Sequence, residues 1–277
     1  MSNPVLNERR LHAAGNTWAP PEPSTDHFPP VTDGQVSSWQ SQVMTVNGVI
    51  SATATLFVLL LASAAVGWIA TGEPTEVLSN DGSIGYSYSI PPLAWGGLIL
   101  GIGLTFLLMF KPHLARFIAP IYALAEGFFV GAISRMYETY YDGIVVQAAG
   151  ATIAVFAVML VLYRTRIIKV TERFRKIVVT ATIGVMLFYG VSMLIRLVAG
   201  ADSVSFLSSP SLLGIAFSVF VAGLAAFNLA LDFDFIERGV KQGLDKKFEW
   251  YAAFGLLVTI IWLYLEILRL LSKLRQR

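Results

Sequence analysis

The chain has 277 residues, of which 55% are hydrophobic and only 14% charged, and its formal net charge is +2. It contains no cysteine, which excludes disulfides, thiolate nucleophiles and cysteine-based metal sites. The sequence has no soluble patch of basic residues interleaved with aromatic residues, so it does not indicate binding to nucleic acid.

The first 43 residues form a polar segment that is rich in Pro, Ser, Asn and Glu. Such a segment has too few apolar residues to fold alone, and we expect a disordered tail. Its composition does not fit a secretory signal peptide, because the first apolar run begins too late in the chain. We therefore divide the chain into a tail, residues 1–43, and a membrane domain, residues 44–277.

Seven apolar stretches follow, each close to the ~20 residues that a helix needs to cross a bilayer. They cover residues 46–70, 93–110, 117–137, 144–163, 177–199, 212–231 and 250–271. Short alternating strands typical of a membrane barrel are not visible, and only helices otherwise satisfy the backbone inside hydrocarbon. The sequence therefore predicts an all-α integral membrane protein with seven transmembrane helices.

Lys and Arg residues lie mainly in the loops after the fourth and sixth stretches, whereas residues 71–92 and 200–211 contain none. The positive-inside rule then places the N-terminus, with its tail, in the cytoplasm of a multi-pass protein of the plasma (inner) membrane. An odd number of spans places the C-terminus outside, although its last residues are basic. Either the seventh helix is held by its neighbours against these charges, or it is re-entrant.

Four acidic residues on or near the apolar stretches are candidates for function, because charge is costly there and usually functional. Glu126 is flanked by apolar residues for more than two turns, so it must face the interior, pair with a cation or stay protonated. Asp232 and Asp234 follow the sixth stretch and could simply mark the helix end at the interface. Glu266, in the seventh stretch, could pair with Arg269 three residues later.

Motifs of common enzyme classes are absent: the sequence has no GxxxxGK[ST], GxGxxG or HExxH, and its three histidines are scattered. We therefore do not expect an enzyme. Two small-residue patterns, Gly97 with Gly101 and Gly127 with Gly131, favour close helix packing rather than ligand binding.

Several segments resemble the Bax inhibitor-1 (transmembrane Bax inhibitor motif) family. The resemblance rests on Ala125-Glu126-Gly127 with Gly131, on Gln147-Ala148 with Thr152 and Phe156, on the segment from Leu231 to Gly239, and on Leu263-Tyr264-Leu265-Glu266. Together they cover about residues 93–271. Departures include Ala132, where the family has proline, and Glu266, where it has aspartate.

The resemblance implies a bundle whose last helix is central, and, as in bacterial members, a pH-sensitive calcium leak governed by two facing aspartates on spans six and seven. Asp232 corresponds to the first aspartate. Two alignments compete for the second: one places it at Glu266, the other near Thr259.

We therefore expect a calcium or cation leak that uses buried carboxylates, with Asp232 and Glu126 as candidate Ca²⁺ ligands and Asp234 and Glu266 as further candidates for ion binding and pH sensing. Carboxylates supply the oxygen ligands that Ca²⁺ prefers, and two acids close together share one proton and can act as a switch. The expected partners are lipid, Ca²⁺ and protons, with no cofactor beyond transient Ca²⁺. The alternative is a non-transporting membrane scaffold that modulates a protease or a stress-response partner.

Overall fold

The computed structural model describes residues 42–73, 75–78, 84–87, 91–199 and 209–276. The predicted tail lies outside the described residues except for its last two positions. The helices, in chain order, are α2 (Val46–Ala70), α3 (Pro92–Phe110), η2 (Pro112–Leu114), α4 (Ala115–Tyr140), α5 (Ile144–Arg164), α6 (Glu172–Ala199), α7 (Leu212–Lys241) and α8 (Phe248–Arg275). Seven of these helices in the described chain are long and apolar enough to cross a membrane, which confirms the predicted fold class.

The helix α7 is longer than its apolar stretch predicts: it continues ten residues past position 231, to Lys241. The extension is stabilised because its charges are paired one turn apart, Arg238 with Asp234 and Lys241 with Glu237. Asp232 therefore lies inside the helix, ~14 Å from its end at ~1.5 Å per residue. The interpretation that Asp232 and Asp234 mark a helix end is wrong.

The segment between α2 and α3 contains a short antiparallel hairpin that the sequence analysis does not predict. Its strands are β1 (Thr75–Leu78) and β2 (Ile84–Ser87), with Thr75 opposite Ser87 and Leu78 opposite Ile84. Strands of four residues carry too little periodicity to stand out in a sequence.

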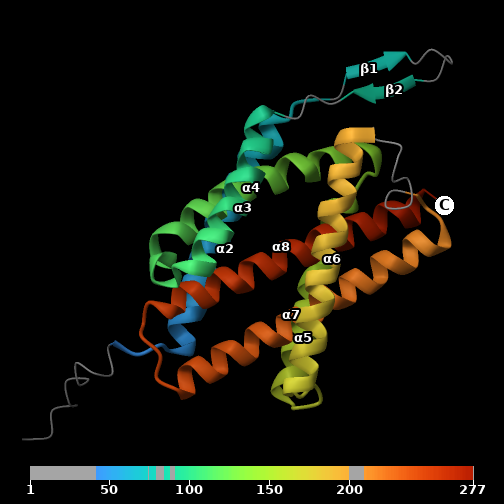
Figure 1. The fold of residues 1–277 in the computed structure, drawn as a ribbon. Helices are drawn as coiled ribbons and strands as arrows, with labels where there is room; N and C mark the ends of the chain where they lie inside the picture. Colours follow the sequence, from blue (N-terminus) through green and yellow to red (C-terminus); the bar gives the residue numbers. More distant parts are fainter. Residues whose placement is uncertain (1–41, 74, 79–83, 88–90, 200–208, 277) are drawn as a thin grey trace, which may run out of the picture. The chain divides into compact units, whose positions relative to one another are not determined.

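The last helix is central, as the resemblance implies. One face of α8 joins α2, α3 and α4 in a core that includes Phe254, Leu257 and Ile261. Another face packs with α5 and α7 through residues such as Leu256 and Leu263. Figure 1 shows α8, in red, running between these two groups of helices. At 28 residues, or ~42 Å, α8 is long enough to cross the ~30 Å hydrocarbon layer, which argues against a re-entrant last helix.

Close packing of α2 against α4 depends on glycine. A Cβ placed on Gly127 would overlap the carbonyl oxygen of Leu60, and one on Gly131 would overlap that of Ala64. The same holds for Gly97, which meets the carbonyl of Ala125. The small-residue patterns are therefore packing positions, as predicted.

The start of α8 is tied to the start of α2 by a buried acid. The Oε1 atom of Glu249 accepts hydrogen bonds of 2.9 Å from both the backbone N–H and the hydroxyl of Thr45, the N-cap of α2. A carboxylate at a helix N-terminus is favoured by the helix dipole and by the unpaired N–H groups there. Glu249 thus anchors α2 against the central helix.

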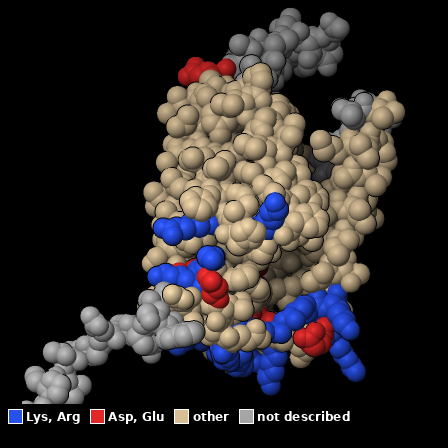
Figure 2. Space-filling view, turned by 60° about the vertical axis from the view of Figure 1, so that its left-hand side comes forward, with Lys and Arg blue, Asp and Glu red and all other residues tan. Residues whose placement is uncertain are grey.

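Basic side chains gather at one end of the bundle, which we call the basic end (Figure 2). It carries the connection from α5 to α6, with Arg166 and Lys169, the start of α6, with Arg173, and the connection from α7 to α8, with Lys246 and Lys247. Among the described residues, basic side chains are thus concentrated at one end of the bundle, the pattern on which the predicted orientation rests.

We expect Gly131→Ala to lower the midpoint of thermal unfolding in detergent, because overpacking costs about 1–3 kcal/mol and the new methyl group would push α4 from α2. The matched control is Gly150→Ala in α5, where an added Cβ meets nothing. That change should keep or raise the midpoint, since alanine favours a helix by ~1 kcal/mol over glycine. Equal midpoints for Gly131→Ala and the parent would contradict this account of the α2–α4 contact.

Candidate functional site: buried carboxylates

Asp232 lies at the interface of α7 with α8. A Cβ on Gly255 would stand 3.8 Å from its Oδ1 atom, and the side chain of Thr259 lies beside the carboxyl group. Its Oδ2 atom is shielded from solvent and has no hydrogen-bond partner among the described residues. Within the described chain no basic side chain forms an ion pair with Asp232.

Glu126 is buried, with 7% of its surface exposed, and its carboxyl group packs directly on Gly101 of α3. A Cβ at Gly101 would overlap this carboxyl group, so the glycine makes room for it. No ion pair of Glu126 occurs in the described part of the chain. The predicted interior position is confirmed, and pairing with an arginine is not observed.

Asp232 and Glu126 lie at a similar depth but in different interfaces. The ring of Tyr122, one turn before Glu126, packs edge-on against Phe254 at 4.8 Å between centroids. Glu126 is therefore near the level of Leu257, midway between Gly255 and Thr259, which flank Asp232. The structure does not bring the two acids together, since Glu126 faces α3 and Asp232 faces α8.

Glu266 is also buried, with 2% of its surface exposed, but it has partners of its own. Its Oε1 atom accepts hydrogen bonds from the guanidinium of Arg269 at 2.9 Å and from the hydroxyl of Tyr189, on α6, at 3.0 Å. The predicted pairing of Glu266 with Arg269 is confirmed. Because Asp232 faces Thr259, seven residues or ~10 Å before Glu266 along α8, the geometry agrees with the alignment that places the second position near Thr259.

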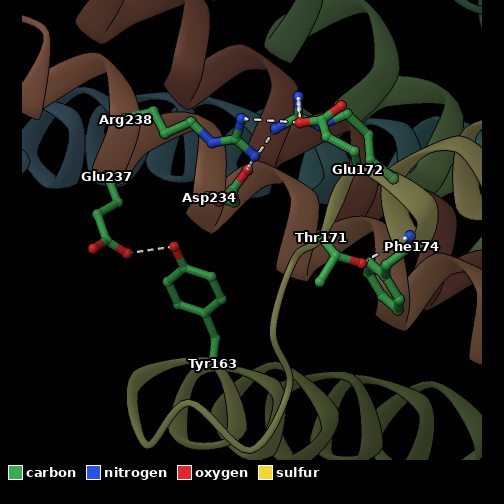
Figure 3. Close-up of polar contacts among 8 residues, drawn as sticks. Tyr163, Thr171, Glu172, Phe174, Asp234, Glu237 and Arg238 are labelled. Atoms are coloured by element: carbon green, nitrogen blue, oxygen red, sulfur yellow. Dashed lines mark hydrogen bonds and ion pairs between the residues drawn. The ribbon is translucent and has the colours of Figure 1, made fainter.

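Asp234, two residues after Asp232, belongs to an ion-pair network at the basic end. Arg175 of α6 contacts Asp234 at 2.8 Å, and Arg238 bonds the same oxygen from one turn along α7. Both arginines also contact Glu172, at 3.2 and 3.7 Å. Figure 3 shows Arg238 reaching Asp234 and Glu172 together. This network joins α6 to α7.

A second network joins α5 to α7 one turn further along. Tyr163 donates a hydrogen bond to Glu237, and Figure 3 shows its ring pointing at that carboxylate. Arg166, in the loop after α5, contacts the other oxygen of Glu237 at 2.5 Å. The hydrogen bond and the charge of Glu237 raise the pKa of the Arg166 guanidinium. Acids in this region are structural partners of arginine and tyrosine.

Two buried charged residues are missed by the sequence analysis. Glu249 is one, and Lys273, with 1% of its surface exposed, is the other. Lys273 lies in the last turn of α8, where a basic side chain is expected to be exposed to solvent. The signal in the sequence is its regular spacing, seven residues after Glu266, which itself follows Thr259 by seven.

Clusters of three or more His, Cys, Asp or Glu side chains able to hold a metal ion do not occur among the residues that the structure describes. The acids are instead distributed along the bundle, either singly or with arginine.

The family model described as Bax inhibitor 1 like matches residues 3–276, nearly the whole chain. No curated protein matches the sequence.

We expect Asp234→Asn to lower the thermal midpoint in detergent, because it leaves Arg175 and Arg238 without their shared carboxylate. The loss should be about 1–2 kcal/mol, reduced from the value for a fully buried pair because both arginines are partly exposed. The control, Glu172→Gln, removes a carboxylate whose side chain is 70% exposed and should change the midpoint much less. Equal effects of the two changes would show that Asp234 does not hold α6 to α7.

Proposed function

Because the chain belongs to the Bax inhibitor 1 like family, we propose that it is a proton-controlled leak that passes Ca²⁺ down its gradient across the plasma membrane. The basic end of the bundle faces the cytoplasm in this proposal, as does the N-terminus. Asp232 is the principal ion ligand and proton sensor.

The observation that carries the proposal is the lack of a basic partner for Asp232 among the described residues. The other acids at its end of α7, Asp234 and Glu237, are neutralised by arginine and lysine. Asp232, two residues earlier in α7 than Asp234, has a shielded oxygen without a hydrogen-bond partner among the described residues. An acid retained in a membrane span without a counter-ion marks an ion or proton path more often than a structural contact.

The surroundings of Asp232 suit weak and transient contact with Ca²⁺. Calcium takes six to eight oxygen ligands in its stable sites, and one carboxylate with the hydroxyl of Thr259 supplies far fewer. A conducted ion must leave as easily as it enters, so a partial ligand set favours passage over storage. Protonation of Asp232 removes both its charge and its strongest oxygen ligand, and the flux should then fall as the pH falls.

Glu126 is the second acid in the proposal, with a role separate from that of Asp232. It too lacks an ion pair in the described chain, and it lies at a similar depth between α3 and α4. A charge there strengthens the negative potential that attracts a cation into the bundle. The arginine partners of Asp234 and Glu266 favour structural roles for these two predicted site residues.

The test is dye-reported Ca²⁺ flux into proteoliposomes of the purified chain across about pH 5–8, a range in which carboxylates in apolar surroundings can titrate. Wild-type flux should decrease as the pH is lowered. Asp232→Asn keeps the shape but not the charge, so its flux should stay low and independent of pH. Glu126→Gln should lower the flux and leave its pH dependence in place.

The matched control is Asp234→Asn, which removes an acid two residues away that already has two arginine partners. Its flux should retain the wild-type pH profile. If Asp232→Asn conducts and titrates like the parent, the leak proposal loses its main support. A regulatory scaffold that acts on a membrane-protein partner would then be the better account.

A further inference from the structure

The face of α8 that meets α6 and α7 carries six residues spaced alternately four and three apart. At 3.6 residues per turn, this spacing places them along one line of the helix. They are Gly255, Thr259, Trp262, Glu266, Arg269 and Lys273, and we call them the α8 stripe. The stripe begins beside Asp232 and ends in the last turn of α8, at the end of the bundle opposite the basic end.

Most of the side-chain nitrogen and oxygen atoms in the described chain that are buried without a hydrogen-bond partner lie on or against this stripe. There are four such atoms, and three of them are Asp232 Oδ2, Trp262 Nε1 and Glu266 Oε2. A buried polar group without a partner costs free energy unless water or an ion reaches it. Water along the α8 stripe would therefore lower the free energy of the folded protein by binding these atoms.

Two of these atoms offer complementary hydrogen bonds to water. Trp262 supplies a donor and Glu266 an acceptor, and the two residues lie one helical turn apart on the same face of α8. The opposite face of α8 offers no such atoms, because Phe254, Leu257 and Ile261 are buried there in an apolar core.

Lys273 closes the stripe at its far end. Its ammonium group is buried and donates hydrogen bonds of 2.9 Å to the carbonyl of Gly214 and the hydroxyl of Ser218, both on α7. Neither acceptor is charged, and in the described part of the chain no carboxylate forms an ion pair with Lys273. The positive charge of Lys273 thus lies at the far end of the α8 stripe, between that end of the bundle and Asp232.

Among the described residues, the two charged groups that interact with Lys273 are Arg269 and Glu266, and together they do not cancel its charge. Glu266 is engaged by Arg269, whose guanidinium also lies 5.0 Å from the ring centroid of Tyr189 on α6. Tyr137 of α4 interacts with the same pair. With both tyrosines neutral, Arg269 and Lys273 exceed Glu266 by one positive charge.

We propose that the cation route of this protein runs along the α8 stripe between α6, α7 and α8, and that Lys273 is the gate residue that closes it at the end opposite the basic end. This inference rests on the proposed function and adds the path and its closure. The ammonium group repels a divalent cation and at the same time binds the first two turns of α7 to α8. Opening requires Lys273 to leave Gly214 and Ser218.

The absence of cysteine allows a test with single cysteines in the full chain. Thr259→Cys places a thiol on the stripe beside Asp232, and Leu257→Cys places one at the same depth on the apolar face. Each is combined with Lys273→Gln, and proteoliposomes with the far end exposed are treated with a cationic methanethiosulfonate reagent. The cysteine at position 259 should react at least about tenfold faster in the Lys273→Gln background, the change expected when a like charge is removed from a low-dielectric path. The cysteine at position 257 should stay unreactive in both backgrounds.

Ca²⁺ flux measured on the same vesicles separates the two claims. Lys273→Gln should raise the flux about tenfold or more, whereas Lys246→Gln, which removes a lysine at the basic end, should not. If the Ca²⁺ flux rises in Lys273→Gln while the cysteine at position 259 reacts no faster, the α8 stripe is not the route, and the proposed leak still stands. Reactivity without flux in any variant would support the route and contradict the leak. If Lys273→Gln does not fold, Ser218→Ala removes one of the two acceptors of Lys273, and unchanged reactivity in that variant would overturn the gate.

Discussion

The helix α8 carries an apolar face and a polar face along its whole length, and each face needs a matching neighbour. The apolar face packs against α2, α3 and α4, where glycines let the backbones come close. The polar face meets α6 and α7, which supply Tyr189, Asp232 and Ser218. A helix with charged residues on one side cannot face lipid, because each exposed charge would cost several kcal/mol there. The helix α8 is central because both of its faces must be covered by other helices.

Charge pairing separates the four candidate acids, together with Glu237, into two groups. Asp234, Glu237 and Glu266 have arginine or lysine partners. Each also bonds to a neighbouring helix, Asp234 and Glu266 to α6 and Glu237 to α5. Asp232 and Glu126 have none among the described residues. Because an unpaired carboxylate in a membrane interior is costly, its retention calls for a role that a paired acid cannot fill. Asp232 and Asp234 are both carboxylates, and it is the presence or absence of a cationic partner that distinguishes their expected roles.

Hydropathy and length were sufficient to predict seven helices, because crossing a bilayer imposes a fixed number of apolar residues. They were not sufficient for the end of α7, whose last turns are held by Arg175 and Arg238, partners that hydropathy does not report. The neighbour of Asp232 depends on the register between α7 and α8, which the connecting turn sets through tertiary contacts, so the sequence left Glu266 and Thr259 as alternatives. Lys273 was overlooked because a basic residue near a chain end reads as solvated. Its regular spacing from Thr259 and Glu266 was visible in the sequence and indicates the buried stripe.

The central claim is that Asp232 is an isolated acid whose protonation controls ion passage. Infrared spectroscopy of the reconstituted protein tests it most directly, because a protonated carboxyl group has a carbonyl stretch that a carboxylate lacks. We predict a carbonyl band that grows as the pH falls, in step with the loss of Ca²⁺ flux in the same vesicles, and that is missing in Asp232→Asn. A band that persists unchanged in Asp232→Asn, or flux that changes with pH while no band titrates, would contradict the account.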